Sequence, residues 1–128
     1  MLPNFLLEEQ VVRQDGAGPA IELGENVPEI VSLTFGITRI VEQECVELSI
    51  WASPDGESWG DKPVAAFPQK FYCGVYTVAV DLSLRPDARF LRAQWKVNRW
   101  GRGENAPLFG LYLFAAPAFA EQALRATA

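Results

Sequence analysis

The sequence has no histidine, only two cysteines and no long apolar run, and each shortage excludes a class of function. Without histidine, Ser-His-Asp and Cys-His catalytic sites and histidine-rich zinc or iron centres cannot form. No apolar stretch approaches the roughly 20 residues of a membrane-spanning helix, so we expect no membrane partner. We therefore expect a non-enzymatic protein, because no nucleophile has a recognisable base beside it.

The two cysteines, Cys45 and Cys73, form no CxxC motif, and their spacing does not decide whether they pair. The N-terminal stretch MLPNFLLEEQ lacks the basic start and long apolar segment of a signal peptide, so we expect a cytoplasmic location. In a reducing cytoplasm thiols stay free, which favours two small strand residues over a redox pair. At 128 residues, the chain 1–128 fits a single domain that needs neither metal nor disulfide to fold.

The net charge of −5 is unevenly distributed along the chain. Residues 1–61 hold 12 acidic and 2 basic residues, whereas residues 62–128 hold 4 acidic and 9 basic residues. Either the two halves neutralise each other within one folded domain, or opposed charged faces attract neighbouring copies and give a homo-oligomer.

Apolar and polar residues alternate along several short segments, as in strands that bury one face. Turn residues such as Ser53-Pro54-Asp55-Gly56 separate these segments, and no helical pattern occurs before residue 117. This predicts an all-β fold, an antiparallel β-sandwich of the jelly-roll type with about eight strands. The expected strands are 5–13, 20–23, 30–41, 46–53, 64–67, 71–82, 88–97 and 108–114.

Three features of this prediction concern the ends of the chain. The turn Asp15 to Pro19 predicts an N-terminal hairpin between the first two strands. The last strand, Leu108 to Phe114, is apolar on both faces, so either it is central and covered twice or one face meets a partner. Pro117 to Thr127 is expected to form either a short C-terminal helix or a frayed tail.

Two stretches resemble the discoidin, or coagulation factor 5/8 type C, family and its galactose-binding-like jelly-roll relatives. The first, Leu48 to Trp59, is similar to that family's strand followed by S-x-D-G-x-x-W. The second, Ala88 to Arg92, is similar to its late A-R-Y-[VL]-R strand. The resemblance implies a galactose-binding-like sandwich that binds glycans, phospholipids or proteins through loops at one end, without catalysis. The family's ligand-binding loops have no matching motif in this chain, so the resemblance assigns no ligand residue.

Tryptophans beside polar residues suggest the chemistry of the ligand. Sugar rings present flat C–H faces on which an indole stacks, while neighbouring polar groups bond the hydroxyls. Trp95 has the parity of a core residue, and Trp59 is expected to pack back as a lid, which leaves Trp51 and Trp100 as the best stacking candidates. Two loop regions, 53–60 and 98–105, supply the remaining polar groups. The candidate ligand-binding residues are Trp51, Asp55, Glu57, Trp59, Arg99, Trp100, Arg102 and Asn105.

Catalysis, metal binding and nucleic-acid binding have weaker support in the sequence. Asp55 and Glu57 lack a partner that would raise one carboxyl pKa, so turn formation is favoured over catalysis. The Asp55-Gly56 turn could contribute oxygen ligands to calcium, but no full ligand run such as D-x-D-x-D-G occurs, and we expect no cofactor and no metal site. The basic Arg99 to Arg102 stretch is short and the chain is acidic, so we expect no nucleic-acid partner.

The sequence supports two hypotheses about function. The first is a carbohydrate-binding β-sandwich module that takes a glycan or a protein ligand. The alternative is a structural or assembly protein that self-associates through its last strand and its opposed charge faces.

Overall fold

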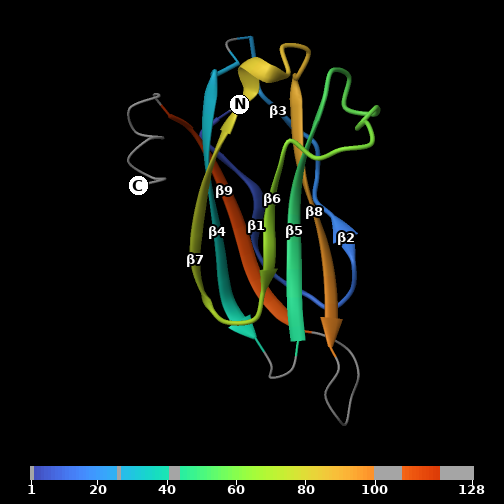
Figure 1. Ribbon diagram of the computed structural model, residues 1–128, viewed down its shortest axis with the longest axis vertical. Helices are drawn as coiled ribbons and strands as arrows, with labels where there is room; N and C mark the ends of the chain where they lie inside the picture. The colour runs from blue at the N-terminus through green and yellow to red at the C-terminus, as the bar shows by residue number, and fades with distance from the viewer. Residues whose placement is uncertain (1, 26, 41–43, 100–107, 119–128) are drawn as a thin grey trace.

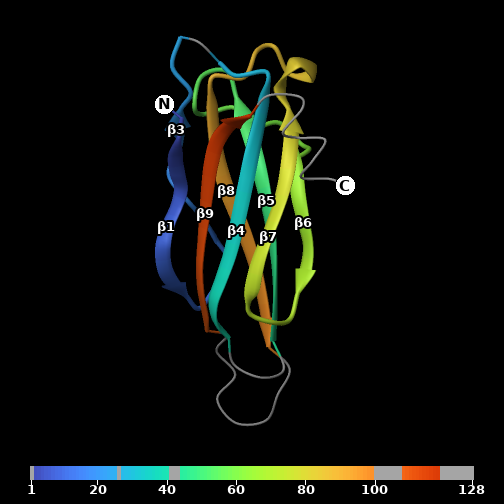
Figure 2. The same ribbon diagram turned by 90° about the vertical axis from the view of Figure 1, so that its left-hand side faces the viewer.

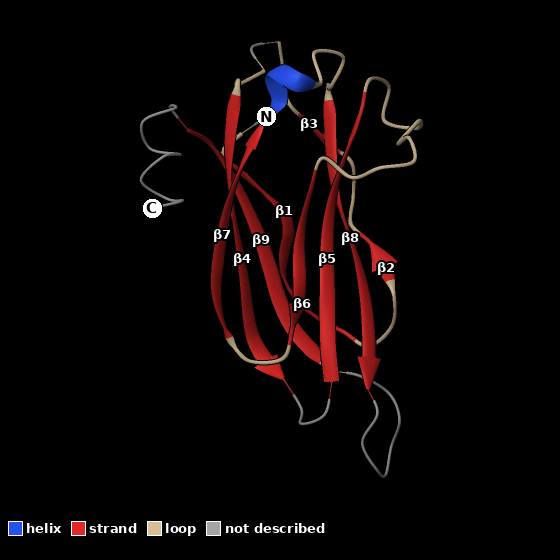
Figure 3. Ribbon diagram, viewed as in Figure 1, coloured by secondary structure: helices blue, strands red, loops and turns tan. Residues whose placement is uncertain are grey.

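The computed structural model describes residues 2–25, 27–40, 44–99 and 108–118, and these ranges form two antiparallel sheets packed face to face (Figures 1 and 2). A single turn of 3-10 helix, η1 (Leu82–Leu84), lies at one end of the sandwich (Figure 3). The strands are β1 (Asn4–Val12), β2 (Gly16–Ala17), β3 (Ile21–Glu22), β4 (Ile30–Ile40), β5 (Glu44–Ser53), β6 (Ala65–Lys70), β7 (Gly74–Asp81), β8 (Phe90–Arg99) and β9 (Phe109–Ala118).

The strand order is that of a jelly roll. One sheet has the order β1-β9-β4-β7, and the other has the order β2-β8-β5-β6, with β3 also paired to β8. Because β2 and β3 both pair with β8, they behave as one interrupted strand. Counting them as one gives eight strands in two interleaved sheets, the arrangement of a jelly roll. The predicted all-β antiparallel sandwich is therefore confirmed.

The core lies between the two sheets, and the predicted alternation places its residues there. In β4 the side chains of Val31, Leu33, Phe35 and Ile37 are buried, and in β5 those of Val46, Leu48 and Ile50 face them from the other sheet. The buried apolar residues of both sheets form one cluster. Strands with a period of two bury one face in this way and leave every second side chain outside.

The predicted N-terminal hairpin is wrong. β1 pairs with β9 in the four-stranded sheet, whereas β2 and β3 pair with β8 in the other sheet. The turn after Val12 therefore carries the chain from one sheet to the other instead of folding it back on its neighbour.

Several strand boundaries also differ from the prediction. β6 continues past Pro68 to Lys70, which an edge strand permits because its outer N–H groups need no partner. β7 begins only at Gly74, after the exposed Phe71 and Tyr72. β8 continues to Arg99, so Asn98 and Arg99 belong to a strand and not to a loop.

The last strand is central in its sheet, but only its inward face is fully buried, because Tyr112 and Phe114 on the outward face are half-buried; the predicted double coverage is therefore not found. β9 pairs with β1 on one side and β4 on the other. It extends to Ala118, so Pro117 is part of a strand, and the rest of the predicted C-terminal helix lies outside the described residues. Within the described ranges, no helix has the length and apolar character that crossing a membrane demands.

Candidate ligand-binding site

The polar faces of β5 and β8 form a ladder of matched pairs on the outside of the five-stranded sheet. The register places Glu47 opposite Lys96, Ser49 opposite Gln94 and Trp51 opposite Arg92. Since inward-facing residues alternate with these pairs, all six side chains point away from the core. The result is one indole beside a carboxylate, an amide and an ammonium group on a single surface.

The indole of Trp51 lies along its own strand. Its Nε1 donates a hydrogen bond to the Oγ of Ser49 at 2.9 Å, and this hydroxyl in turn donates to the backbone oxygen of Gln94 at 3.5 Å. Ser49 is two residues away on the same face, so this bond ties the indole to its neighbouring side chain on the sheet surface. The half-buried ring therefore presents a fixed apolar plane.

Around this ring, the two sides of the sheet enclose a groove of about 500 Å³. Asp15 and Gly16 form one side, and Pro63 and Pro68 form the other. The Oδ1 of Asp15 accepts a hydrogen bond from the backbone N of Val97 at 2.8 Å, which fixes that side to β8. The floor includes Glu47, Ser49, Trp51, Gln94 and Lys96. A volume of several hundred Å³ with a few convergent polar groups is typical of small-molecule sites.

Trp59 packs back onto the same sheet, as the sequence predicted. Its ring lies 4.4 Å from the guanidinium carbon of Arg92, a cation–π contact. Arg92 is also the cross-strand partner of Trp51. The two predicted site residues Trp51 and Trp59 therefore both neighbour Arg92. Trp59 does not line the groove itself.

Asp55 organises the turn that follows β5. Its Oδ1 accepts hydrogen bonds from the backbone N atoms of Glu57 and Ser58, both at 2.8 Å, and from the Oγ of Ser53 at 2.9 Å. The bonds from the Ser58 and Glu57 backbone, together with the Ser53 hydroxyl, lower the carboxyl pKa to about 2. Gly56 has φ of 81°, a left-handed conformation that glycine adopts without strain. These hydrogen bonds satisfy the Asp55 carboxylate within the turn itself, so its lowered pKa does not require a bound ligand.

Arg99 and the turn that contains Asp55 lie at opposite ends of the paired strands β5 and β8. In the register of β5 and β8, Ser53 pairs with Phe90 at one end and Glu44 pairs with Arg99 at the other. Nine residue steps along β8 separate these ends by about 30 Å. The structure therefore does not bring Arg99 to the turn that contains Asp55 and Glu57, as Figure 1 shows for the two ends of β8. Trp100, Arg102 and Asn105 lie outside the described residues.

Neither cysteine takes part in a disulfide. Cys45 is buried in β5, and Cys73 is exposed before β7, and both are free thiols. Burial raises the pKa of the Cys45 thiol, and the neighbouring Glu47 and Glu44 charges raise it further. Within the described part of the chain, no three acidic or cysteine residues gather closely enough to hold a metal ion.

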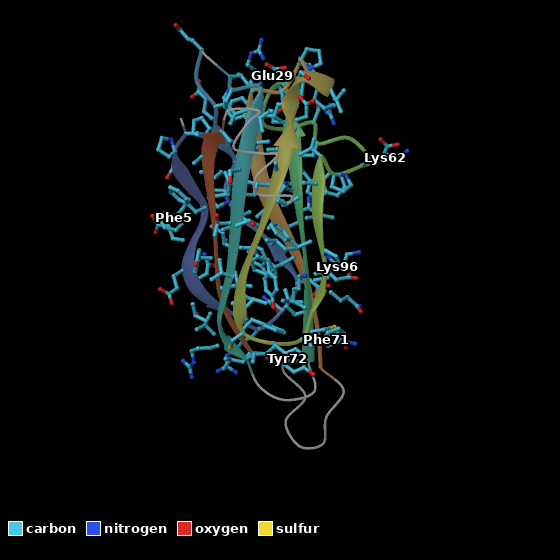
Figure 4. The ribbon with its side chains drawn as sticks, turned by 60° about the vertical axis from the view of Figure 1, so that its left-hand side comes forward. Phe5, Glu29, Lys62, Phe71, Tyr72 and Lys96 are labelled. Carbon is cyan, nitrogen blue, oxygen red and sulfur yellow. The ribbon has the colours of Figure 1, made fainter. Side chains whose placement is uncertain are left out.

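The groove also contains residues that the sequence reasoning did not select. Glu47, Gln94 and Lys96 share the outward parity of Trp51 and Arg92, and this parity is readable from the sequence. The adjacency of β5 and β8, which joins two such rows into one surface, is not readable in the same way. Lys96 projects from this surface on the opposite side of the molecule from Phe5 (Figure 4).

No protein-family model matches the chain, and no curated protein matches it.

Proposed function

We propose that this protein is a non-catalytic module that binds a neutral carbohydrate in the groove over Trp51. The observation that supports the proposal is the half-buried indole of Trp51 that lines the groove and is tied to Ser49 by a hydrogen bond, with hydrogen-bonding side chains beside it. A pyranose ring can stack its C–H face on such a plane while its hydroxyls reach the surrounding groups.

The groups around the ring suit hydroxyls. Glu47 accepts hydrogen bonds, Lys96 donates them and the Gln94 amide does both. Glu47 and Lys96 carry opposite charges and are paired in register across the two strands. Because their fields largely cancel for a distant ion, the groove favours a neutral saccharide over a strongly charged one.

The resemblance to discoidin-like modules adds limited support to this proposal. The first motif stretch begins on β5 and the second ends on β8, and Ser53 and Ala52 of the first pair with Phe90 and Leu91 of the second. The family resemblance stays a prediction, and the proposed site lies on a sheet face instead of the loops that the resemblance implied.

The test is a titration of a panel of neutral mono- and oligosaccharides by isothermal calorimetry, with Trp51→Ala as the deciding variant. Removing the stacking plane should weaken the affinity for a binding saccharide by about two- to tenfold, since an aromatic stacking contact contributes roughly 0.5–1.5 kcal/mol. Gln94→Ala, which removes a hydrogen-bonding group but no ring, should weaken the same saccharide by a smaller factor.

The matched control is Tyr72→Ala, because this side chain is aromatic, 77% exposed and outside the groove. Tyr72 lies at the end of the sandwich opposite η1 (Figure 4), and its replacement should leave saccharide affinity unchanged. If Trp51→Ala binds as tightly as the wild type, or if no saccharide in the panel binds, the proposal is wrong.

Self-association remains the alternative function, and the structure limits its form. Both edges of β9 are already paired within the sheet, so the last strand cannot add a strand from a second copy. Any contact between copies through β9 would use its outward face, which carries Tyr112 and Phe114.

A further inference from the structure

The outer face of the four-stranded sheet carries three aromatic rings in contact, Phe5, Tyr112 and Phe114, which we call the aromatic corner. Phe5 of β1 pairs with Phe114 of β9, and their ring centroids are 4.9 Å apart. Phe5 also meets Tyr112 at 6.3 Å between centroids. This surface lies on the other sheet from the Trp51 groove, so a ligand here is independent of the carbohydrate proposed there.

Tyr112 forms the floor of the aromatic corner because Gly36 lies beneath it. These two residues are register partners on β9 and β4. A Cβ at position 36 would lie 2.6 Å from the Oη of Tyr112 and would overlap its Cε1 and Cζ. The ring therefore rests directly on the glycine backbone, parallel to the sheet, and turns its other face outward. Glycine within a strand is typical of places where another group approaches the backbone closely.

Phe5 forms a wall beside this floor. The ring planes of Phe5 and Tyr112 are inclined to each other at 79°. Because the Tyr112 ring lies parallel to the sheet, the Phe5 ring stands nearly perpendicular to the sheet. Phe5 is 41% exposed and projects from the edge of the molecule (Figure 4). Two ring planes at about a right angle give a ligand two aromatic surfaces to contact at once.

Two carboxylates complete the site because β1 is irregular. Consecutive residues of a regular strand point to opposite faces, yet Glu8 and Glu9 both line the depression over the aromatic corner. The pairing of β1 with β9 shifts between Phe5 and Leu7 and again between Leu7 and Gln10. Such bulges redirect side chains and are frequent beside binding sites.

The depression measures about 740 Å³, and Thr34 is its remaining lining residue. Its two charged groups are therefore both negative, and its apolar surface consists of aromatic rings. A ring face attracts a cation through its quadrupole, and weakly hydrated alkylammonium groups lose little hydration on contact with it. Carboxylates nearby add attraction for positive charge.

We propose that the aromatic corner binds an organic cation of the alkylammonium class, with the positive head group over Tyr112 and beside Phe5. Glu8 and Glu9 supply the opposing charge. Charge complementarity selects this ligand over an uncharged apolar molecule of the same shape. The site is shallow and its carboxylates are exposed, so affinity for a small head group is expected on the order of 1 mM.

The test uses choline as the probe and 3,3-dimethylbutan-1-ol as its neutral isostere, titrated into the full chain and followed by NMR. Choline should shift the signals of Phe5 and Tyr112 in a saturable way, and the isostere should bind about tenfold more weakly. Glu8→Gln with Glu9→Gln should weaken choline binding by about tenfold, because two unit charges a few Å away are removed. Raising the salt concentration should weaken it as well.

The matched control is Glu25→Gln with Glu29→Gln, which removes the same charge from two exposed glutamates outside the depression. It should leave choline binding unchanged. The proposal is overturned if the isostere binds as well as choline, if no saturable shift occurs, or if both double variants have the same effect. It is also overturned if the surface joins two copies of this chain, shown by a dimer that Phe5→Ala dissociates and choline does not.

Discussion

Substituting Gly36 by alanine is the sharpest test of how the outer face of the four-stranded sheet is built. An alanine Cβ at this position would overlap the ring of Tyr112, while the backbone itself permits alanine because φ is not positive. The ring must therefore leave the sheet. An aromatic side chain buries roughly 150–250 Å², and losing one face of contact exposes about 70 Å². At about 25 cal/mol per Å² this costs nearly 2 kcal/mol of unfolding free energy.

A second effect of the same substitution has the opposite sign. Replacing glycine by alanine removes conformational freedom from the unfolded chain and stabilises a compatible site by about 0.4–1 kcal/mol. Gly36→Ala should therefore destabilise the wild type by about 1–1.5 kcal/mol net, which is a lowering of the melting temperature by about 3–6 °C for a domain of this size. In a Tyr112→Ala background the clash is absent, and the same substitution should stabilise the protein.

The assay is a double-mutant cycle from urea unfolding, followed by tryptophan fluorescence. A coupling of about 2 kcal/mol between positions 36 and 112 is expected because the residues are in direct contact. Additive effects, with Gly36→Ala equally destabilising in both backgrounds, would refute the position that we assign to the tyrosine ring. The single variant should also weaken choline binding, because the floor of the aromatic corner is displaced.

Three further predictions concern single groups. The carboxyl pKa of Asp55 is lowered from 3.8 to about 2, so its stabilising contribution is present above pH 3.8 and is lost as the pH falls through 2. The difference in unfolding free energy between wild type and Asp55→Ala should therefore shrink over that range. An NMR titration midpoint near 3.8 for this carboxyl would contradict the prediction. Under native conditions a thiol reagent should label Cys73 rapidly and Cys45 only on unfolding, and rapid labelling of two thiols would count against a buried Cys45. Glu44→Ala should cost about 1–3 kcal/mol in urea unfolding, because its Oε1 accepts from the backbone N of Leu108 at 2.9 Å; Glu44→Gln, which keeps the acceptor, should cost less.

Period-two burial was sufficient to predict the fold class from the sequence. The core faces of β4 and β5 follow from alternation alone, and the Ser53 to Gly56 turn follows from its residue types. The same patterns could not predict the N-terminal topology. The predicted turn Asp15 to Pro19 contains the strand β2, and the crossing between the two sheets comes before this strand, so turn-forming residue types did not locate the change of sheet.

The candidate site was only partly predictable for a related reason. Trp51 has outward parity, so its exposure could be predicted, but its neighbours across the sheet depend on which strands pair. Gln94 and Lys96 are more than 40 residues away in sequence and become neighbours only because β5 pairs with β8. Arg99 lies at the opposite end of the paired strands from the Asp55 turn, because β5 and β8 are antiparallel and each region follows the end of its own strand.

The aromatic corner leaves a signal in the sequence, because residues of β1 and β4 beside it depart from regular alternation. Gly36 has the outward parity of Ser32 and Thr34 in β4, yet it is buried, and a glycine at such a position indicates that something lies against the strand. The consecutive Leu6-Leu7 and Glu8-Glu9 pairs likewise break the period of two, and in the structure both leucines are buried and both glutamates are exposed. Departures from alternation in β1 and β4 thus coincide with the surface that combines aromatic rings and carboxylates. The regularly alternating positions of this sandwich build its core, so they are explained by burial. The positions that break the alternation have other roles: Gly36 lets the Tyr112 ring pack closely on β4, and the irregularity of β1 places the two carboxylates of Glu8 and Glu9 on one side.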